Sequence, residues 1–153
     1  PMRMSVTPRA EARVAPAAVV AHLCNVRQSM ETHDANPEAI VQRQLDAFNA
    51  RDLAGLLSVY ADDAEMFEFP EKLLARGADQ MGERFTQRFR EPNLHAQLRH
   101  RIVSGMRVID HECVTRTFPE GPGEIDLVMI YEVAGDRIVK AWSIAGATRL
   151  FPR

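Results

Sequence analysis

The sequence has few of the residues that mark specialised protein classes. It has two cysteines, Cys24 and Cys113, which lie far apart and outside any C-x-x-C pair. A disulfide scaffold and a structural zinc site are therefore not expected. No apolar run approaches the roughly 20 residues that a membrane span requires. The formal net charge is only -2, with acidic and basic residues interspersed, so neither nucleic acid nor a membrane is an expected partner.

What remains is the composition of an ordinary globular protein. The chain has 153 residues, of which 46% are hydrophobic and 26% charged. This length corresponds to one domain with a short appendage, and it suffices for a core and one pocket. The low cysteine content favours a soluble, cytoplasmic protein.

The first 35 residues differ from the rest and are rich in Ala, Arg, Pro and Val. The apolar segment Val14–Cys24 imitates a secretory signal, but it lacks a good cleavage site and His22 interrupts it. The stretch Pro16–Met30 fits one helix. Met30 is also a plausible start of translation, which leaves the status of the preceding residues open. We predict an N-terminal arm over residues 1–35 and a domain over residues 36–153.

The domain begins with a strong helix signal. Asn36 is a good N-cap residue, Pro37 fits the first helical position, and apolar residues then recur at helical spacing up to Arg51. Asp52 caps a second predicted helix, Leu53–Tyr60. Further along the chain, the spacing of apolar residues predicts a strand at Glu65–Phe69, a helix at Asp79–Arg90, and strands at Glu124–Val133 and Ile138–Thr148.

From Leu94 onward the hydrophobic period is two, which is typical of strands. Ser104–Arg107 fits a two-residue hairpin turn with glycine at its first central position. This turn sets the pairing of the strands on either side of it. It predicts the pairs Arg101 with Asp110 and Arg99 with Glu112 on one face, and His100 with His111 and Leu98 with Cys113 on the other, more apolar face.

The order of elements predicts an α+β fold, a cone-shaped curved antiparallel sheet wrapped around three helices, with the N-terminal arm in front of it. The open mouth of such a cone is a natural pocket. The outer sheet face is predicted to expose apolar side chains, which a homodimer would cover. They are Val103, Val114 and either Val128 and Ile130 or Leu127 and Met129.

Two stretches carry a resemblance to a known superfamily. Residues 41–53, VQRQLDAFNARDL, followed by Tyr60–Ala64, YADDA, resemble the opening of bacterial ketosteroid isomerases. They are similar to the wider nuclear transport factor 2-like superfamily, which includes SnoaL-like polyketide cyclases. The resemblance implies the cone fold for residues 36–153. It does not imply one activity, because relatives include isomerases, cyclases, dehydratases, hydrolases and binding modules.

The resemblance also implies roles for individual residues. It places the carboxylate base of the isomerases at Glu68. The position of their oxyanion-hole tyrosine is occupied by Gln44, so the main phenolic donor is missing and a true steroid isomerase is not expected. Their second donor, a protonated aspartic acid, is matched by Asp126 if that side chain faces inward.

The residues themselves add further candidates. Glu68 stands among Met66, Phe67 and Phe69, so an inward orientation would desolvate it and raise its pKa. The alternative is a solvated glutamate at a strand end. His100 and His111, as cross-strand neighbours, could form a coupled acid–base pair beside Glu68 or could be buried neutral histidines. No metal site is predicted, because no His-x-His or His-x-x-x-His spacing is present.

Other side chains are candidates for the pocket wall. The amide of Gln44 could donate to a substrate carbonyl or bind neighbouring backbone. Tyr60 and Trp142 could line the cavity or belong to the core, and Met66 and Leu98 complete the expected apolar lining. Arg116 is expected at the surface.

Two functions remain open from the sequence. The first is a cone domain that binds an apolar carbonyl compound and acts on it by proton transfer without a cofactor, as an isomerase or cyclase. In that case Glu68 is the base, His100 or His111 the partner acid, and Gln44 the carbonyl donor. The second is a non-catalytic module for ligand binding, dimerisation or protein interaction.

Overall fold

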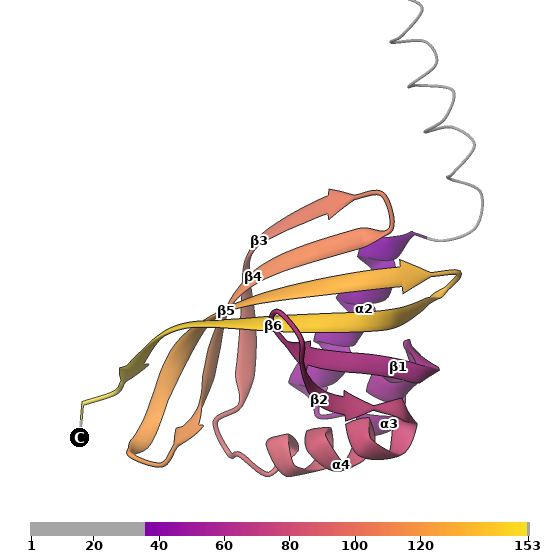
Figure 1. Cartoon of the computed structure of the whole chain (residues 1–153). Helices are drawn as coiled ribbons and strands as arrows, with labels where there is room; N and C mark the ends of the chain where they lie inside the picture. Colours follow the sequence, from indigo (N-terminus) through magenta and orange to yellow (C-terminus); the bar gives the residue numbers. More distant parts are fainter. Residues whose placement is uncertain (1–35, 153) are drawn as a thin grey trace, which may run out of the picture. The chain divides into compact units, whose positions relative to one another are not determined.

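The computed structural model describes residues 36–152, and the predicted N-terminal arm lies outside them. No helix in that range is long and apolar enough to cross a membrane. The helices are α2 (Pro37–Ala50), α3 (Leu53–Ser58) and α4 (Gly77–Phe89). The strands are β1 (Tyr60–Glu68), β2 (Lys72–Arg76), β3 (His95–Ser104), β4 (Arg107–Phe118), β5 (Gly121–Ala134) and β6 (Arg137–Leu150) (Figure 1).

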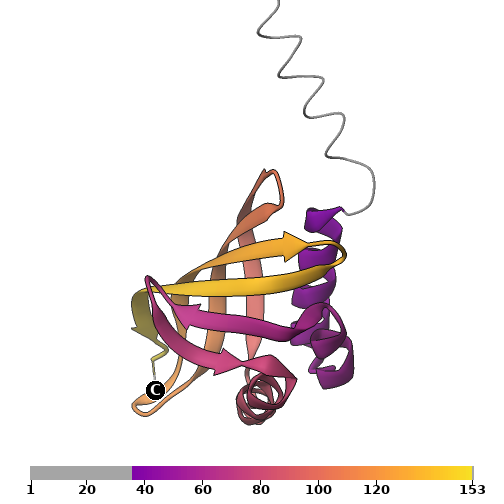
Figure 2. The ribbon, with the colours of Figure 1, turned by 45° about the vertical axis from the view of Figure 1, so that its right-hand side comes forward.

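The strands form one sheet in the order β2-β1-β6-β5-β4-β3. All neighbours are antiparallel except β1 and β6, which run parallel. The sheet curves, and α2, α3 and α4 pack along one side of it (Figures 1 and 2). This arrangement confirms the predicted α+β cone.

The first two helices begin where the sequence predicts. The Asn36 side chain accepts a hydrogen bond of 3.2 Å from the backbone N–H of Ala39, and Pro37 opens α2. The Asp52 carboxylate accepts one of 2.9 Å from Gly55 at the start of α3. The predicted second helix is two residues too long, because Tyr60 already pairs with Ile138 of β6.

Strand β2 was not predicted. Lys72–Arg76 is short and mostly exposed, and it is held as an edge strand by its pairing with β1. Of its five residues only Ala75 is buried, which is too few for an alternating pattern by which the strand could be found.

The β3–β4 hairpin turns at Gly105, whose φ is 56°, and it pairs Ser104 with Arg107 as predicted. The pairs Arg101 with Asp110 and His100 with His111 are also confirmed. Beyond them a β-bulge at Arg99 shifts the register. Leu98 therefore pairs with Glu112 and Gln97 with Cys113, so the predicted pairs Arg99 with Glu112 and Leu98 with Cys113 are wrong.

The orientation of β4 is the main departure from expectation. Val108, Asp110, Glu112 and Val114 are buried, whereas the residues between them are half-buried. We call the face that carries these four residues, toward the helices, the inner face, and the opposite one the outer face. The charged face of the hairpin therefore points into the molecule.

The core fills the space between the helices and the inner face. It joins residues of all three helices to β1, β2, β4, β5 and β6. Its most deeply buried side chains include Val41, Leu56, Met81, Val108, Tyr131 and Ile138. A smaller cluster around Leu45, Leu94, Ala96 and Val114 continues it toward the open end of the sheet.

Candidate functional site

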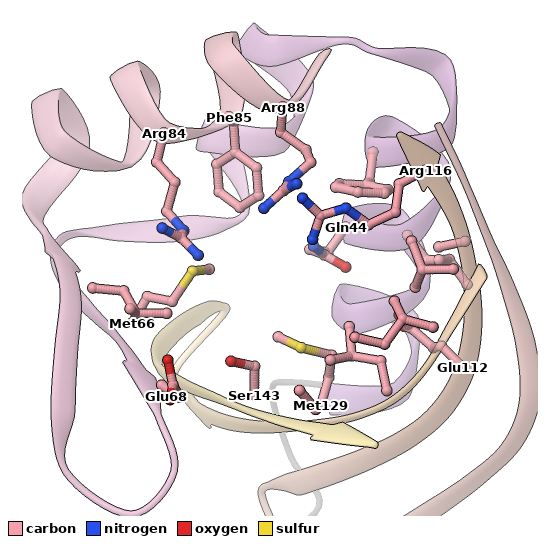
Figure 3. Close-up of a pocket in the computed structure, with 18 of the residues that line it drawn as sticks. Gln44, Met66, Glu68, Arg84, Phe85, Arg88, Glu112, Arg116, Met129 and Ser143 are labelled. Carbon is pink, nitrogen blue, oxygen red and sulfur yellow. The ribbon is translucent and has the colours of Figure 1, made fainter. Parts of the chain in front are cut away.

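A cavity of about 260 Å³ lies between the inner face and helices α2 and α4 (Figure 3). Its walls combine apolar and ionisable side chains. They are Gln44, Leu45, Phe48, Met66, Glu68, Leu74, Arg84, Phe85, Arg88, Ala96, Glu112, Val114, Arg116, Ile125, Leu127, Met129, Tyr131, Ser143 and Ala145. Ligand pockets in proteins span about 300–1,000 Å³, so this cavity lies just below that range and suits a small ligand.

Glu112 is the buried carboxyl group of this cavity. Only 4% of the residue is exposed, and its buried Oε1 atom has no hydrogen-bond partner among residues 36–152. Burial raises the pKa of Glu112 from the usual 4.5 to about 7, and the nearby Asp110 charge adds to the rise while Arg101 opposes it. A carboxyl group with this pKa can both donate and accept a proton near neutral pH.

Asp110 lies two residues earlier on the same face and is paired. The Arg101 guanidinium donates two hydrogen bonds of 2.7 Å to its carboxylate and a third, of 2.8 Å, to Gln42 of α2. Asp110 is fully buried, and only 9% of the Arg101 side chain is exposed. The positive charge of Arg101 therefore compensates the buried negative charge of Asp110 next to Glu112.

A second polar group reaches the cavity from α2. Gln44 is 5% exposed, and its Oε1 accepts a hydrogen bond of 3.2 Å from the Tyr131 hydroxyl. Burial holds the pKa of Tyr131 well above its ordinary value, so the hydroxyl keeps its proton. With the Gln44 carbonyl engaged, the amide nitrogen is left as the donor.

Three arginines also line the cavity. Arg84 and Arg88 come from α4, and Arg116 from the end of β4 (Figure 3). Burial and the neighbouring charge of Arg88 lower the pKa of Arg84, while Glu68 raises it.

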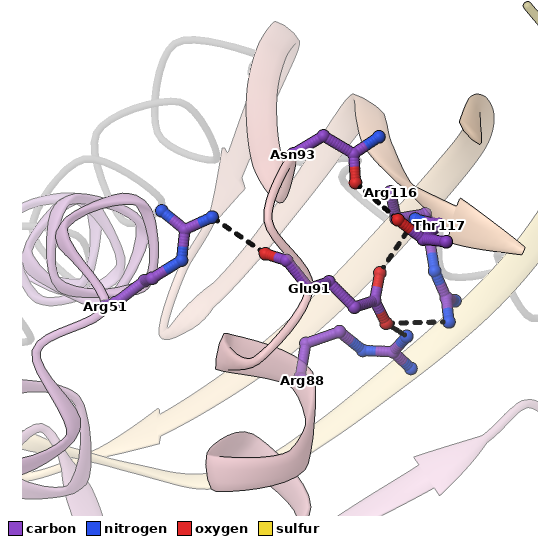
Figure 4. Close-up of polar contacts among 6 residues, drawn as sticks. All are labelled: Arg51, Arg88, Glu91, Asn93, Arg116 and Thr117. Atoms are coloured by element: carbon purple, nitrogen blue, oxygen red, sulfur yellow. Dashed lines mark hydrogen bonds and ion pairs between the residues drawn. The ribbon is translucent and has the colours of Figure 1, made fainter.

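Two of these arginines are held by Glu91, which follows α4 (Figure 4). Its carboxylate accepts hydrogen bonds of 2.6 Å from Arg88, 3.3 Å from Arg116 and 3.0 Å from the backbone N–H of Thr117. Arg51 donates to the Glu91 carbonyl at 2.9 Å. The network therefore ties the α4–β3 loop to β4 and orients two guanidinium groups at the cavity.

Of the residues named from the sequence, Gln44, Met66 and Glu68 line the cavity. Glu68 is not desolvated, however. Its side chain is 52% exposed and pairs with Lys72 at 3.1 Å. Of the two alternatives for Glu68, the structure therefore has the solvated glutamate at a strand end, because β1 ends there at the rim.

His100 and His111 are cross-strand neighbours with stacked rings, whose centroids lie 6.0 Å apart. They stand on the outer face, in a shallow depression that also includes Cys113 and Asp126. His111 Nε2 lies 3.1 Å from Asp126 Oδ1. The expectation that both histidines and Asp126 share a pocket with Glu68 is thus corrected, because the sheet separates them from the cavity.

The three remaining candidates, Tyr60, Leu98 and Trp142, pack against other side chains outside the cavity. Tyr60 is 2% exposed and belongs to the core, where its hydroxyl has no partner among residues 36–152. Leu98 packs on the smaller cluster. Trp142 stacks on Phe67 at 5.9 Å on the outer face, since Ser143 faces the cavity. None of the three lines the cavity.

The sequence reasoning missed Glu112, Arg84 and Arg88, and it placed Arg116 at the surface. On β4 the outward residues Ile109, His111 and Cys113 are no less apolar than the inward ones, so hydrophobicity selects the wrong face. The signal in the sequence was the pair Gln42 and Gln44 on the buried side of α2. Polar side chains there indicate that polar residues of the sheet lie opposite them. Within residues 36–152, no group of three or more His, Cys, Asp or Glu side chains is placed to hold a metal ion.

Comparison with known proteins agrees with this geometry. Residues 41–141 match the model of the SnoaL-like domain. None of the curated proteins matches the sequence significantly. An uncharacterised cystatin-fold protein from Novosphingobium aromaticivorans is 23% identical, with a TM-score of 0.66 over 71% of this chain and 97% of that one.

Two further solved structures have the same fold. A SnoaL-like protein of unknown function from Burkholderia thailandensis is 25% identical, with a TM-score of 0.60 over 72% of this chain and 94% of that one. An LEH-like epoxide hydrolase from M. tuberculosis is 13% identical, with a TM-score of 0.62 over 71% and 80%. The family and the fold support a cone domain that binds a small molecule. Because the family match covers more than half of its length, the chain belongs to the SnoaL-like domain family.

Proposed function

We propose that the cavity binds an apolar small molecule bearing a carbonyl group and that Glu112 moves a proton on it. The observation that carries this proposal is a buried carboxyl group in the wall of the cavity, one of whose oxygens has no hydrogen-bond partner in the described part of the chain. Its pKa of about 7 lies near neutral pH, where a general acid or base is most effective.

The proton transfer balances without any other reactant. The Glu112 carboxylate removes a proton from the carbon next to the carbonyl, and the electron pair moves onto the carbonyl oxygen. The Gln44 amide nitrogen donates a hydrogen bond to that oxygen, which stabilises the enolate. Glu112, now protonated, returns the proton to the same carbon or to a conjugated one, which gives proton exchange or isomerisation.

Two carboxyl groups face the cavity, and their environments differ. Glu112 is buried and has no partner for one oxygen among residues 36–152, whereas Glu68 is half exposed and pairs with Lys72. Desolvation makes a carboxylate a stronger base. We therefore assign the proton transfer to Glu112 rather than to Glu68.

The pair of carboxyl groups supplies a matched test. The probe is β-tetralone, a bicyclic ketone, whose exchange of α-protons in D₂O is followed by ¹H NMR. The wild-type chain should accelerate the exchange above buffer. Glu112→Gln should lower the protein-catalysed rate by about 10²–10⁴-fold, while Glu68→Gln should keep most of it.

The opposite ranking, with Glu68→Gln inactive and Glu112→Gln active, would move the base to Glu68. If the wild type does not accelerate the exchange but is thermally stabilised by β-tetralone, the enzyme hypothesis fails and the chain is a non-catalytic binding module. A circular dichroism spectrum and melting curve of each variant confirm that the fold is retained.

We further propose that two copies of the chain pair through the outer face. An apolar row crosses five strands on this face. Each of its residues is the direct cross-strand partner of the next, in the order Ile102, Ile109, Ile130, Trp142 and Phe67. Ile102 is 61% exposed. Val128 also faces outward, whereas Val114, Leu127 and Met129 line the cavity, which corrects part of the predicted patch.

A charge at the centre of this row tests the pairing. Ile130→Lys should convert a dimer into a monomer in analytical ultracentrifugation, because a dimer would bury the ammonium group without a partner. Ala39→Lys, which adds the same charge at an exposed position of α2, serves as the control and should leave the dimer intact. A wild-type chain that sediments as a monomer at high concentration would contradict the proposal.

A further inference from the structure

The charges around the cavity do not balance. Three guanidinium groups, those of Arg84, Arg88 and Arg116, line one side of it. Glu91 is the carboxylate that contacts two of them, and it is shared between both. Glu68, at the rim, is paired with Lys72. Positive charge is therefore in excess on this side.

Arg84 is the least satisfied of the three. It is half-buried, and within residues 36–152 no carboxylate lies within ion-pair distance and no acceptor takes a hydrogen bond from its guanidinium. The charges that act on its pKa are those of Arg88, of the same sign, and of Glu68. An arginine stays protonated in such a setting, so its charge is available to an anion.

Arg116 also has a donor group without an acceptor in residues 36–152. Its Nε atom is buried and has no hydrogen-bond partner among the described residues. The guanidinium lies 5.1 Å over the ring of Phe118 and is also held by Glu91. The Arg116 guanidinium lies in the wall of the same cavity as that of Arg84 (Figure 3). One arginine from α4 and one from β4 are therefore available to a ligand there.

We propose that the ligand of this cavity carries a carboxylate, which Arg84 and Arg116 bind. The inference rests on the proposed function and specifies its substrate class, an apolar carbonyl compound with an acidic group. Met66, Leu127 and Met129 supply the apolar wall for the rest of the molecule.

A carboxylate fits this site better than a phosphate. Guanidinium groups bind planar carboxylates through two parallel hydrogen bonds. Most of the remaining wall is apolar, and transfer of a doubly charged group into such surroundings costs more than transfer of a singly charged one. Glu68 and Glu91 also lie close enough to oppose a second negative charge.

The test compares acids with neutral partners of almost the same shape. Benzoate, phenylacetate and 2-naphthoate are each titrated against the full chain by isothermal calorimetry, beside their primary amides. At least one acid should bind about tenfold or more tightly than its amide, since a charge-assisted hydrogen bond favours the acid by that factor.

Variants then locate the charge that is used. Arg84→Met keeps the apolar stem and should abolish the preference for the acid, and Arg84→Lys should restore part of it. Arg90→Met, at the exposed end of the same helix, should leave the preference unchanged. Equal affinities for every acid and its amide, or an unchanged preference in Arg84→Met, would overturn the inference.

β-Tetralone keeps the two proposals apart. If the neutral ketone binds and exchanges protons while no acid is preferred, the carboxylate inference fails and the proposed function stands. If an acid is preferred while Glu112→Gln has no effect on exchange, the proton-transfer proposal fails and the anion site stands. If naphthyl phosphate binds more tightly than naphthoate, the carboxylate assignment is overturned.

Discussion

Arg101 and Asp110 form a two-pronged ion pair across the β3–β4 hairpin, with both hydrogen bonds at 2.7 Å and the carboxylate fully buried. The pair lies on the inner face, on the same side of β4 as Glu112. Arg101 also reaches Gln42 of α2, so it links the hairpin to the helix. This link fixes the wall of the cavity from which Glu112 projects.

Loss of one partner should be costly. Asp110→Asn keeps the volume but leaves the buried Arg101 charge without compensation, which typically lowers the free energy of unfolding by about 3–5 kcal/mol. Urea unfolding at neutral pH measures it. The control is Glu132→Gln, which breaks the more exposed pair with Arg107 and should change stability by less than about 1 kcal/mol. Equal effects of the two variants would show that the buried pair is not special.

The raised pKa of Glu112 predicts how stability depends on pH. The usual pKa of 4.5 applies to the unfolded chain, and about 7 to the folded one. Between these values the folded state holds a proton that the unfolded state has released, so the free energy of unfolding falls as pH rises. Above about pH 7 both states are ionised and the fall ends.

Glu112→Gln removes this contribution. The difference in unfolding free energy between the variant and the wild type should grow in favour of the variant from pH 5 to pH 8, by an amount on the order of 3 kcal/mol. Other titrating groups cancel in the comparison. A difference that stays constant over this range would mean that Glu112 is ionised already at pH 5.

Glu91 should stabilise the loop between α4 and β3. Glu91→Gln weakens its charge-assisted hydrogen bonds to Arg88 and Arg116 and should lower the free energy of unfolding by about 1–3 kcal/mol. The backbone N–H of Thr117, which donates to Glu91 at 3.0 Å, should exchange with deuterium faster. Glu120→Gln, at an exposed position in the next turn, should change neither quantity.

The sequence was sufficient for the parts of the fold that depend on local rules. Asn36 and Asp52 could be recognised as helix caps because a short side chain with an acceptor is needed at that place. Gly105 could be recognised as a turn residue because glycine readily adopts the positive φ that the structure has there. From that turn the pairs as far as His100 with His111 followed by counting residues.

The candidate site depended on features that are not local. The bulge at Arg99 interrupts the count, and nothing in the neighbouring residues marks it. The inner face of β4 holds Asp110 because Arg101 of β3 pairs with it and is itself held by Gln42 of α2. Glu112 follows Asp110 on the same face. A prediction that places the apolar residues inside therefore exchanges the two faces of β4. It puts His111 in the pocket, where the structure has Glu112.

The most direct test of the account is the titration of Glu112 itself. The chain is labelled with ¹³C at the glutamate side-chain carboxyl carbon, and the Glu112 signal is assigned as the one missing from Glu112→Gln. We expect a midpoint near pH 7 for Glu112, well above the usual glutamate value of 4.5. A midpoint near 4.5 would contradict it, because Glu112 would then be an ordinary solvated carboxylate with no proton to give at neutral pH.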